Sequence, residues 1–243
     1  QNYSLNSQLK IWMITLLLMI VLIILVGGLT RLTDSGLSIT TWELFVGTLP
    51  PLTSDKWIEY FDLYKTIPEF KEQNFNMTLN EFKIIFWWEW AHRQLGRLIG
   101  LTVLFPMIYF TIKNGFWILK EYSIIFFLVC FQGFIGWYMV SSGLVDRVDV
   151  SHYRLSLHLV IAFIILSIVF WKYLNLTDIK INHINIQLNP IKFFLLLLFL
   201  QLIIGAFVSG MDAGKIYNTW PLMGSSYFPD DSVINDLFNL KVF

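Results

Sequence analysis

Five long apolar stretches leave this chain few ways to fold. The first, IWMITLLLMIVLIILVGGL, begins at Ile11, and the other four follow the polar connecting segments. A helix of about 20 apolar residues crosses the hydrocarbon core of a bilayer and satisfies its own backbone polar groups there. The four later stretches lie approximately at 86–112, 123–140, 155–174 and 191–210. The sequence therefore predicts an all-α integral membrane protein, a helical bundle with five spans.

Composition agrees with this class. Only 14% of the residues are charged and 56% are hydrophobic, whereas soluble domains carry about a quarter charged residues. The formal net charge is zero, so there is no electrostatic basis for binding nucleic acid. Cys130 is the only cysteine, which rules out an intramolecular disulfide, and its apolar surroundings predict a small buried hydrophobe. The first stretch is too long for a signal-peptide core, so we expect a retained helix.

The connecting segments predict an orientation. One set of lysines falls on the same side of the five spans, and this set is Lys10, Lys113, Lys120, Lys172, Lys180 and Lys192. The positive-inside tendency makes that side, with the N-terminus, cytoplasmic. On the opposite side, the polar loop at about 30–85 is too long for a simple connector. We therefore expect this loop to cover part of the molecule.

A polar and aromatic motif, D-x-G-x4-T-W-x-L, occurs twice. It begins at Asp34 in DSGLSITTWELF and at Asp212 in DAGKIYNTWPLM, each time after an odd-numbered span. A repeat of this kind predicts a duplicated four-helix unit in which the fifth span copies the first. The predicted domains are a complete half at 1–175, a cytoplasmic linker at 176–190 and the beginning of a second half at 191–243. Three further helices would complete the second copy, so this interpretation predicts that the chain is truncated at its C-terminus.

Within the motif, a structural role is favoured over chemistry. Asp34 and Gly36 suit a turn that leaves the membrane, and Trp42 suits an anchor at the interface. Glu43 stands where the second copy has Pro221, and its case for a chemical role is weak.

Two of the four histidines are candidates for a functional site. His92 and His158 lie at similar distances from the outer ends of the second and fourth spans, so both imidazoles are expected at one depth. Ionisable residues inside a membrane are functional candidates, and two imidazoles at one depth can ligate one metal centre. The alternative that each ring only hydrogen-bonds another helix stays open. His152 is expected at the interface, and His183 in a solvated cytoplasmic loop.

The neighbours of His92 favour a large planar cofactor. Gly96 and Gly100 follow at four-residue steps and would leave a flat face beneath the imidazole, although such a stripe is more often a helix-packing face. Four arginines near the outer ends of the spans are candidate contacts for the propionates of a porphyrin: Arg31, Arg93, Arg97 and Arg154. Histidine ligation combined with arginine-bound propionates is typical of heme sites.

Glu89 lies three residues before His92 and shares a helix face with it. Simple electron transfer does not need a carboxylate there. The carboxylate could transfer protons or stabilise positive charge near a reacting carbon. The alternative is an interfacial glutamate paired with Arg93.

Four motifs together resemble the heme A synthase family of alphaproteobacteria and mitochondria, over nearly the whole chain. They are GGLTRLTDSGLSITTW, FWWEWAHRQLGRLIG, YRLSLHL and GAFVSGMDAGKIYNTWPLM. The resemblance implies an eight-helix enzyme of two halves in the bacterial inner membrane. This enzyme oxidises the C8 methyl group of heme O to a formyl group, which gives the heme A of cytochrome oxidase.

The resemblance also implies residue roles. His92 and His158 would be the axial ligands of the substrate heme, toward the periplasmic side, with Glu89 and His92 as catalytic residues and Arg93 as the arginine of the family's ExxHR motif. A heme b cofactor would be held by a second histidine pair beyond Phe243. Heme O, membrane lipid, heme O synthase, an electron donor and a second copy of the chain are the expected partners.

Two departures and two alternatives accompany the resemblance. The outer loop lacks the cysteine pair of some bacterial members, which excludes a thiol–disulfide role there, and His152 stands where proline is expected. The same histidine pair would also suit a b-type cytochrome that only transfers electrons. A heme-free transporter or scaffold is the third hypothesis, because repeats also occur in transporters.

Overall fold

The computed structural model describes residues 2–42, 46–145, 147–177, 188–216, 218–219, 221–225 and 227. Glu43, His183 and the second motif's Trp220 lie outside this part of the chain. Within it, five helices are long and apolar enough to cross a membrane: α1 (Asn2–Leu32), α4 (Leu79–Asn114), α5 (Trp117–Gly143), α6 (His152–Asn175) and α7 (Leu188–Gly210). The prediction of an all-α protein with five spans is confirmed, and the chain is a multi-pass membrane protein.

The helices begin earlier than the apolar stretches do. Helix α4 begins at Leu79, about two turns before the predicted span, with a capping box in which Thr78 and Glu81 each bind the other's backbone N–H. Helices α4 and α5 are separated only by Gly115 and Phe116, and Gly115 takes the positive φ of 101°. Hydropathy marks the part of a helix that crosses hydrocarbon. The hydrogen-bond ladder continues into polar sequence, so the predicted boundaries were too short.

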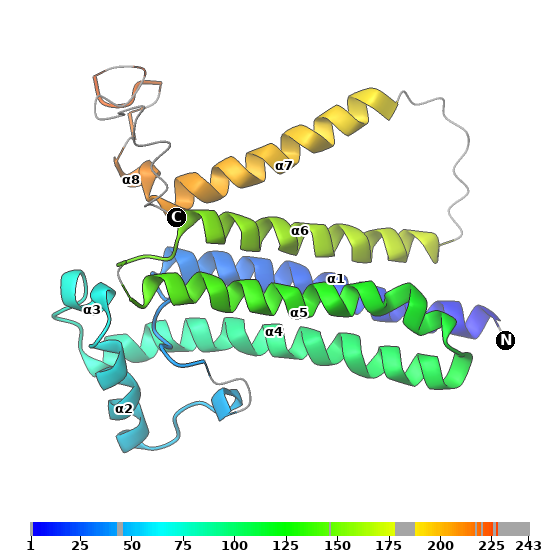
Figure 1. Cartoon of the computed structure of the whole chain (residues 1–243), viewed down its shortest axis with the longest axis horizontal. Coiled ribbons are helices and arrows are strands. Elements are labelled where there is room, and N and C mark those ends of the chain that lie inside the picture. Colours follow the sequence, from blue (N-terminus) through cyan, green and yellow to red (C-terminus); the bar gives the residue numbers. More distant parts are fainter. Residues whose placement is uncertain are drawn as a thin grey trace.

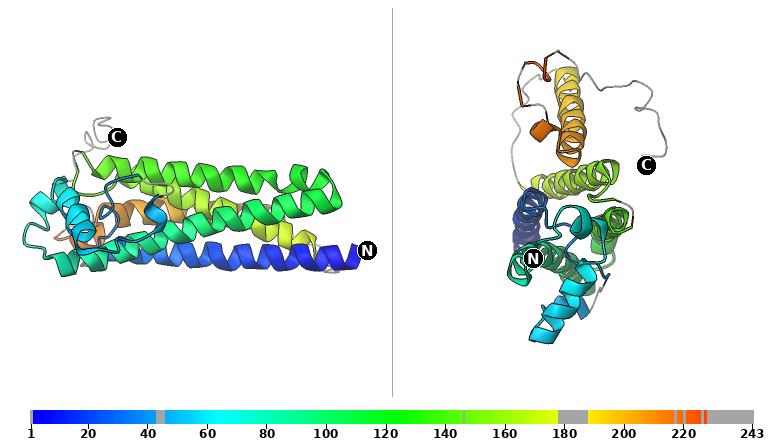
Figure 2. Two further views of the ribbon diagram at one scale, coloured as in Figure 1. Left: turned by 90° about the horizontal axis from the view of Figure 1, so that it is seen from below. Right: turned by 90° about the vertical axis from the view of Figure 1, so that its left-hand side faces the viewer.

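Four of the spans form a closed ring. Helix α4 packs between α1 and α5, and α6 also packs between α1 and α5. Helices α4 and α6 are therefore diagonal to each other, as are α1 and α5. Helix α7 packs on the outside of α6 and leaves the bundle at an angle (Figure 1), and the end-on view shows it standing apart from the ring (Figure 2).

The outer loop folds over one end of this ring. It contains the 3₁₀ turn η1 (Val46–Thr48) and the short helices α2 (Ser54–Tyr64) and α3 (Pro68–Glu72). Both helices lie at the end of the bundle opposite the N-terminus (Figure 1). Helix α2 begins at a capping Thr53, whose hydroxyl accepts from the Lys56 N–H. The loop therefore covers one end of the ring, as its length predicted.

Two separate apolar clusters fill the molecule. A bundle cluster joins α1, α4, α5 and α6 and includes Leu16, Val103 and Val169, all fully buried. A loop cluster joins the outer loop to the beginning of α4 and includes Tyr64 and Phe82. Cys130 belongs to neither cluster, because its side chain is exposed on α5, and the predicted burial was wrong. Among spanning helices an apolar environment does not require burial in protein, since lipid supplies it too.

Helix α8 (Ala213–Ile216) follows α7 directly and begins inside the second motif. Asp34 and Asp212, the first residues of the two motif copies, have φ angles of 48° and 50°. They are the only non-glycine residues with positive φ in the described part of the chain. Aspartate tolerates this left-handed conformation better than most residues do. The first residue of each copy therefore has the same backbone conformation, although the second copy continues as helix α8 and the first as a turn.

Candidate functional site

The histidine pair lies on the two diagonal helices of the ring, His92 on α4 and His158 on α6. Each imidazole lies against a glycine of a neighbouring helix. A Cβ atom placed on Gly27 of α1 would come within 3.1 Å of His92 Nε2, and one placed on Gly136 of α5 would come within 3.1 Å of His158 Cε1. The ring of helices thus alternates histidine and glycine, and any larger residue at either glycine would displace an imidazole.

The predicted glycine stripe has a different neighbour. A Cβ placed on Gly96 would lie 3.7 Å from Ile23 Cδ1 of α1, and one placed on Gly100 would meet no atom within 4 Å. The glycines that accommodate the imidazoles are instead Gly27 and Gly136, on other helices. A glycine within an apolar run gives no local signal of this role, because only the packing of two helices brings glycine and histidine together.

His158 has a second contact on α5, which the sequence analysis did not identify. The Gln132 amide nitrogen donates to the His158 carbonyl oxygen at 3.0 Å and lies 3.3 Å from His158 Nε2. His158 Nδ1 and Gln132 Oε1 are both buried without a hydrogen-bond partner among the described residues. Gln132 lies one turn before Gly136, so the two residues form a slot for the imidazole.

The surroundings of the pair suit a porphyrin better than a bare metal ion. Along α4, His92 lies between the loop cluster and the bundle cluster, and His158 lies just before the α6 residues of the bundle cluster. No group of three or more His, Cys, Asp or Glu side chains that could hold a metal ion occurs in the described part of the chain. A heme iron needs only axial ligands from the protein, since the porphyrin supplies four nitrogens. The residues present therefore fit a heme held by two histidines.

Glu89 lies one turn before Arg93 and is almost completely buried, with 3% of its surface exposed. Its Oε1 accepts from Arg93 Nη2 at 2.6 Å and Nε at 3.0 Å. Its Oε2 accepts from the Ser38 hydroxyl and from the Ile39 N–H, both at 2.7 Å. The pairing with Arg93 that the sequence left open is present in the structure. Glu89 also binds the first motif, a contact that sequence spacing did not reveal.

Arg93 completes this attachment of the first motif to α4. Its guanidinium donates to the Ile39 carbonyl at 2.8 Å and to the Thr41 carbonyl at 3.3 Å, and it lies 5.6 Å from the centre of the Trp42 ring. Charge-assisted hydrogen bonds of this kind are about twice as strong as neutral ones. The motif is therefore held at the end of the bundle by a buried ion pair.

Arg31 joins the two copies of the motif. Its guanidinium pairs with Asp34 at 3.0 Å, with Asp149 at 3.3 Å and with Asp212 at 3.1 Å. It also donates to the Ser209 carbonyl at the end of α7. Burial raises the pKa of Asp149, and the nearby Arg31 only partly offsets this. For Asp212, burial also acts to raise the pKa, but Arg31 and Lys215 together outweigh it, so the pKa is lowered. Arg31 is thus the ionic link between the ring and α7.

The other predicted arginines lie at two places. Arg93 and Arg97 line a small pocket together with Tyr60 and Trp90, and the Trp90 indole N–H is buried with no partner in the described part of the chain. Arg154 stacks on Tyr138, 3.7 Å from the ring centre, and donates to the Tyr138 carbonyl at 2.6 Å. The structure therefore brings Arg93 and Arg97 together and places Arg154 against the end of α5.

His152 packs where α6 and α7 meet. A Cβ on Gly210 would lie 2.7 Å from the His152 Cβ atom, so the two helices approach closely at this glycine. The imidazole meets the Phe207 ring edge to face, at an interplanar angle of 89°. Packing between α6 and α7 therefore accounts for His152, for which the sequence offered no role.

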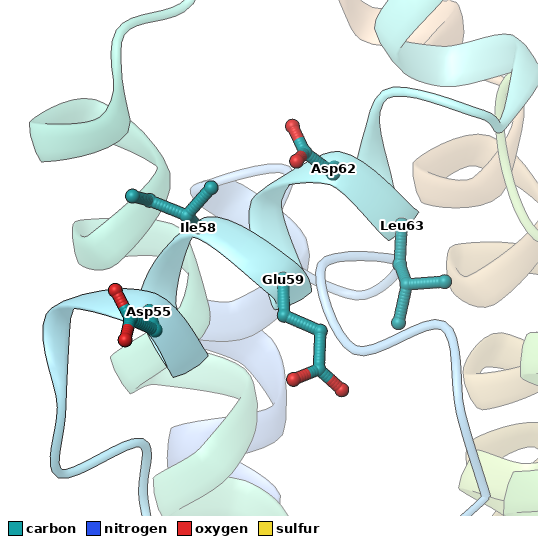
Figure 3. Close-up of a pocket in the computed structure, with 5 residues that line it drawn as sticks. All are labelled: Asp55, Ile58, Glu59, Asp62 and Leu63. Atoms are coloured by element: carbon teal, nitrogen blue, oxygen red, sulfur yellow. The ribbon is translucent and has the colours of Figure 1, made fainter.

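An open pocket on the outer loop is a separate feature. Figure 3 shows its five lining residues on the outward face of α2: Asp55, Ile58, Glu59, Asp62 and Leu63. Two of its carboxylates pair with lysines of the same segment, Glu59 with Lys56 and Asp62 with Lys65. It contains no histidine and no residue of the first motif, so it is not part of the candidate site.

The fold and the site define a multi-pass helical membrane protein with two histidines on diagonal helices of a four-helix ring. Comparison with known proteins gives the family. Residues 10–243 match the model of the COX15-CtaA family, described as cytochrome oxidase assembly protein. This chain belongs to that family.

Curated relatives carry a more specific name. The chain is 53% identical to the heme A synthase of Pelagibacter ubique over 239 residues, which are 98% of this chain and 71% of the relative. It is 46% identical to the heme A synthase of Parvibaculum lavamentivorans, over 90% of this chain and 64% of the relative. It is also 46% identical to the heme A synthase of Rickettsia bellii, over 92% of this chain and 69% of the relative. The chain thus spans about two thirds of the length of these relatives. No solved structure matches it.

Proposed function

We propose that this chain forms the substrate-heme half of a heme A synthase, which oxidises the C8 methyl group of heme O to a formyl group. The relatives' name and the family support this reaction class. The observation that carries the proposal is the pair of imidazoles on the diagonal helices α4 and α6, each in contact with a glycine of a neighbouring helix. A heme held between α4 and α6 would have one histidine available from each of these helices.

In this proposal His92 and His158 would hold the iron of the bound heme, and the heme would supply the redox chemistry. The chain's own task is to position the substrate. The apolar clusters on both sides of His92 along α4 limit the access of water, and the contacts with Gly27 and Gly136 restrict the two imidazoles. Exclusion of water strengthens every polar contact in such a site.

Glu89 and His92 are the proposed catalytic residues. Both oxygens of Glu89 already accept hydrogen bonds, two of them from Arg93. A proton-transfer role therefore requires one contact to open. The contact to the Ser38 hydroxyl is the neutral side-chain partner, so we propose that protons reach Glu89 through Ser38.

Arg93 and Arg97 are the proposed propionate contacts, because they line one pocket with the buried indole N–H of Trp90. For Arg31 and Arg154 the same role stays a prediction, since a propionate would have to replace part of their contacts with the aspartates and with Tyr138. The heme b of the second half, the periplasmic side of the site, the inner membrane and the protein partners also stay predictions from the resemblance.

The test is the heme content of cells that express the full-length protein with single substitutions. His92→Ala and His158→Ala should each bind less heme than the unchanged protein and accumulate heme O. His183→Ala, in the predicted cytoplasmic loop, is the matched control and should leave both unchanged. Unchanged heme content and product in both site variants would contradict the assignment.

Glu89→Gln separates the enzyme from a cytochrome that only transfers electrons. The amide keeps the shape of the side chain but cannot take up a proton, so heme should stay bound while heme A formation falls by about 100-fold. An electron carrier would tolerate the change. Quantifying heme O and heme A by chromatography, with the bound-heme spectrum alongside, distinguishes these results.

A further inference from the structure

The two histidines of the pair are restrained differently. No hydrogen bond joins the His92 ring to any residue in the described part of the chain, whereas the His158 ring lies against the Gln132 amide. Both rings lie against a glycine of a neighbouring helix, so these glycine contacts do not account for the difference. Gln132 is what makes His158 unlike His92.

The orientation of the Gln132 amide follows from its second contact. The His158 carbonyl only accepts, so the amide atom 3.0 Å away must be the NH₂ group. Its other hydrogen is then available to His158 Nε2 at 3.3 Å. Nε2 consequently accepts, and in a neutral imidazole the proton lies on Nδ1. This tautomer is assigned by the hydrogen-bond pattern.

This arrangement weakens His158 as a metal ligand in two ways. A metal binds a neutral imidazole through a nitrogen lone pair, and the Nε2 lone pair is the one that faces the Gln132 amide. Histidine ligands are usually strengthened by an acceptor for their other N–H. His158 Nδ1 is buried with no such acceptor among the described residues.

We propose that Gln132 is a positioning residue that keeps His158 a weak, releasable ligand, while His92 is the strong one. The proposal rests on the proposed function, in which one heme enters the site and a different heme leaves it. Gln132 competes with iron for the Nε2 lone pair, which shortens the residence of heme at the site. A site that must release its product benefits from one weak axial ligand.

The test uses the purified chain and ferric heme b as the probe. Gln132→Leu removes the donor and keeps a similar volume, and Gln132→Asn shortens the amide so that it cannot bridge both acceptors. Gln201→Leu changes an exposed glutamine of α7 and is the matched control. The dissociation constant comes from titration of the Soret band, and the off-rate from transfer of heme to apomyoglobin.

Both Gln132 variants should bind heme b about five-fold more tightly and release it correspondingly more slowly, the change expected for one net hydrogen bond. In the heme-free protein, ¹⁵N spectra of labelled histidine should show the His158 proton on Nδ1, with the population moving toward Nε2 in Gln132→Leu. The His158→Ala variant assigns this signal. The Gln201→Leu control should match the unchanged protein in every measurement.

An unchanged or faster off-rate in both Gln132 variants would overturn the role of Gln132, provided that His158→Ala still loses the bis-histidine spectrum. If instead His92→Ala and His158→Ala both keep that spectrum, the proposed function fails, and the role of Gln132 fails with it. The two failures are seen in different variants and are therefore distinguishable.

Discussion

Glu89 and Glu69 lie at the same end of the molecule and are equally buried, with 3% of each exposed, yet their surroundings differ. Glu89 has the Arg93 guanidinium on one oxygen and two further donors on the other. Glu69 has no cation partner among the residues that the structure describes. Its Oε1 accepts from the Tyr64 hydroxyl at 3.1 Å and from the Asn74 amide at 3.3 Å, and its Oε2 is buried without a partner among the described residues.

The difference shows that partners, and not burial alone, decide what a buried carboxyl group can do. Burial raises the pKa of Glu69 from 4.5 to about 8, against a smaller lowering by the Tyr64 hydrogen bond. Burial likewise raises the pKa of Tyr64. Glu69 is thus a neutral acid that helps to pack the outer loop, whereas Glu89 holds a cation and the first motif. Of the two, only Glu89 lies on the same helix as His92 of the candidate site.

Arg93→Ala should cause the largest loss of stability, because it leaves Glu89 buried without its cation. Removing one partner of a buried pair typically costs about 3–5 kcal/mol, because the remaining charge is uncompensated. We expect a correspondingly large drop in the melting temperature in detergent and release of the segment around Ile39 and Thr41. The double variant Glu89→Ala/Arg93→Ala should recover part of the loss. A single variant as stable as the unchanged protein would contradict the pairing.

Glu69 should make the stability of the folded protein depend on pH. Below about pH 4.5 Glu69 is protonated in both the folded and the unfolded chain, and between 4.5 and about 8 only the folded chain keeps the proton. The unfolded state binds fewer protons in that window, so stability falls as the pH rises. The loss amounts to about 3 kcal/mol between about pH 5.5 and pH 7.5.

Thermal unfolding of the purified protein at several pH values measures this loss. Glu69→Gln is the matched control, because the amide has the same shape and stays neutral. Its melting temperature should vary much less with pH in this window. A slope equal to that of the unchanged protein would assign the pH dependence to another group.

The smallest expected effect is at the partly exposed cluster around Arg31. Asp149→Asn removes one of three carboxylates that share the guanidinium, and 38% of the Asp149 side chain is exposed. Water and the remaining aspartates compensate, so we expect a loss of no more than about 1 kcal/mol. Melting temperatures of Asp149→Asn and Arg93→Ala, measured in one detergent, give the ratio of the two losses of stability. A loss as large as that of Arg93→Ala would place the Arg31 cluster among the buried pairs.

Much of the fold followed from local sequence. The five spans were predicted from apolar length, because a membrane helix must be apolar along its own stretch. The helix ends were missed, since the capping box before α4 and the Gly115 turn extend the helices beyond the apolar runs. Cys130 was misplaced for the related reason that hydropathy does not separate a lipid-facing side chain from a buried one.

The residues of the candidate site also fall into two groups, those that the sequence indicated and those that it did not. His92, His158, Glu89 and the arginines carried chemical signals of their own and were identified from the sequence. Gln132 and Gly136 were not, because an amide and a glycine in an apolar helix are common and acquire a role only from the neighbouring helix.

The five helical spans, the repeated motif and the histidine pair followed from the sequence alone, because these properties belong to individual segments. The tertiary structure decided that α4 and α6 are diagonal, that each imidazole rests on a glycine of another helix, and that Arg31 joins both copies of the motif. These are relations between helices. They depend on which faces pack together, and in a membrane the apolar pattern that would mark those faces is present on every side of the helix.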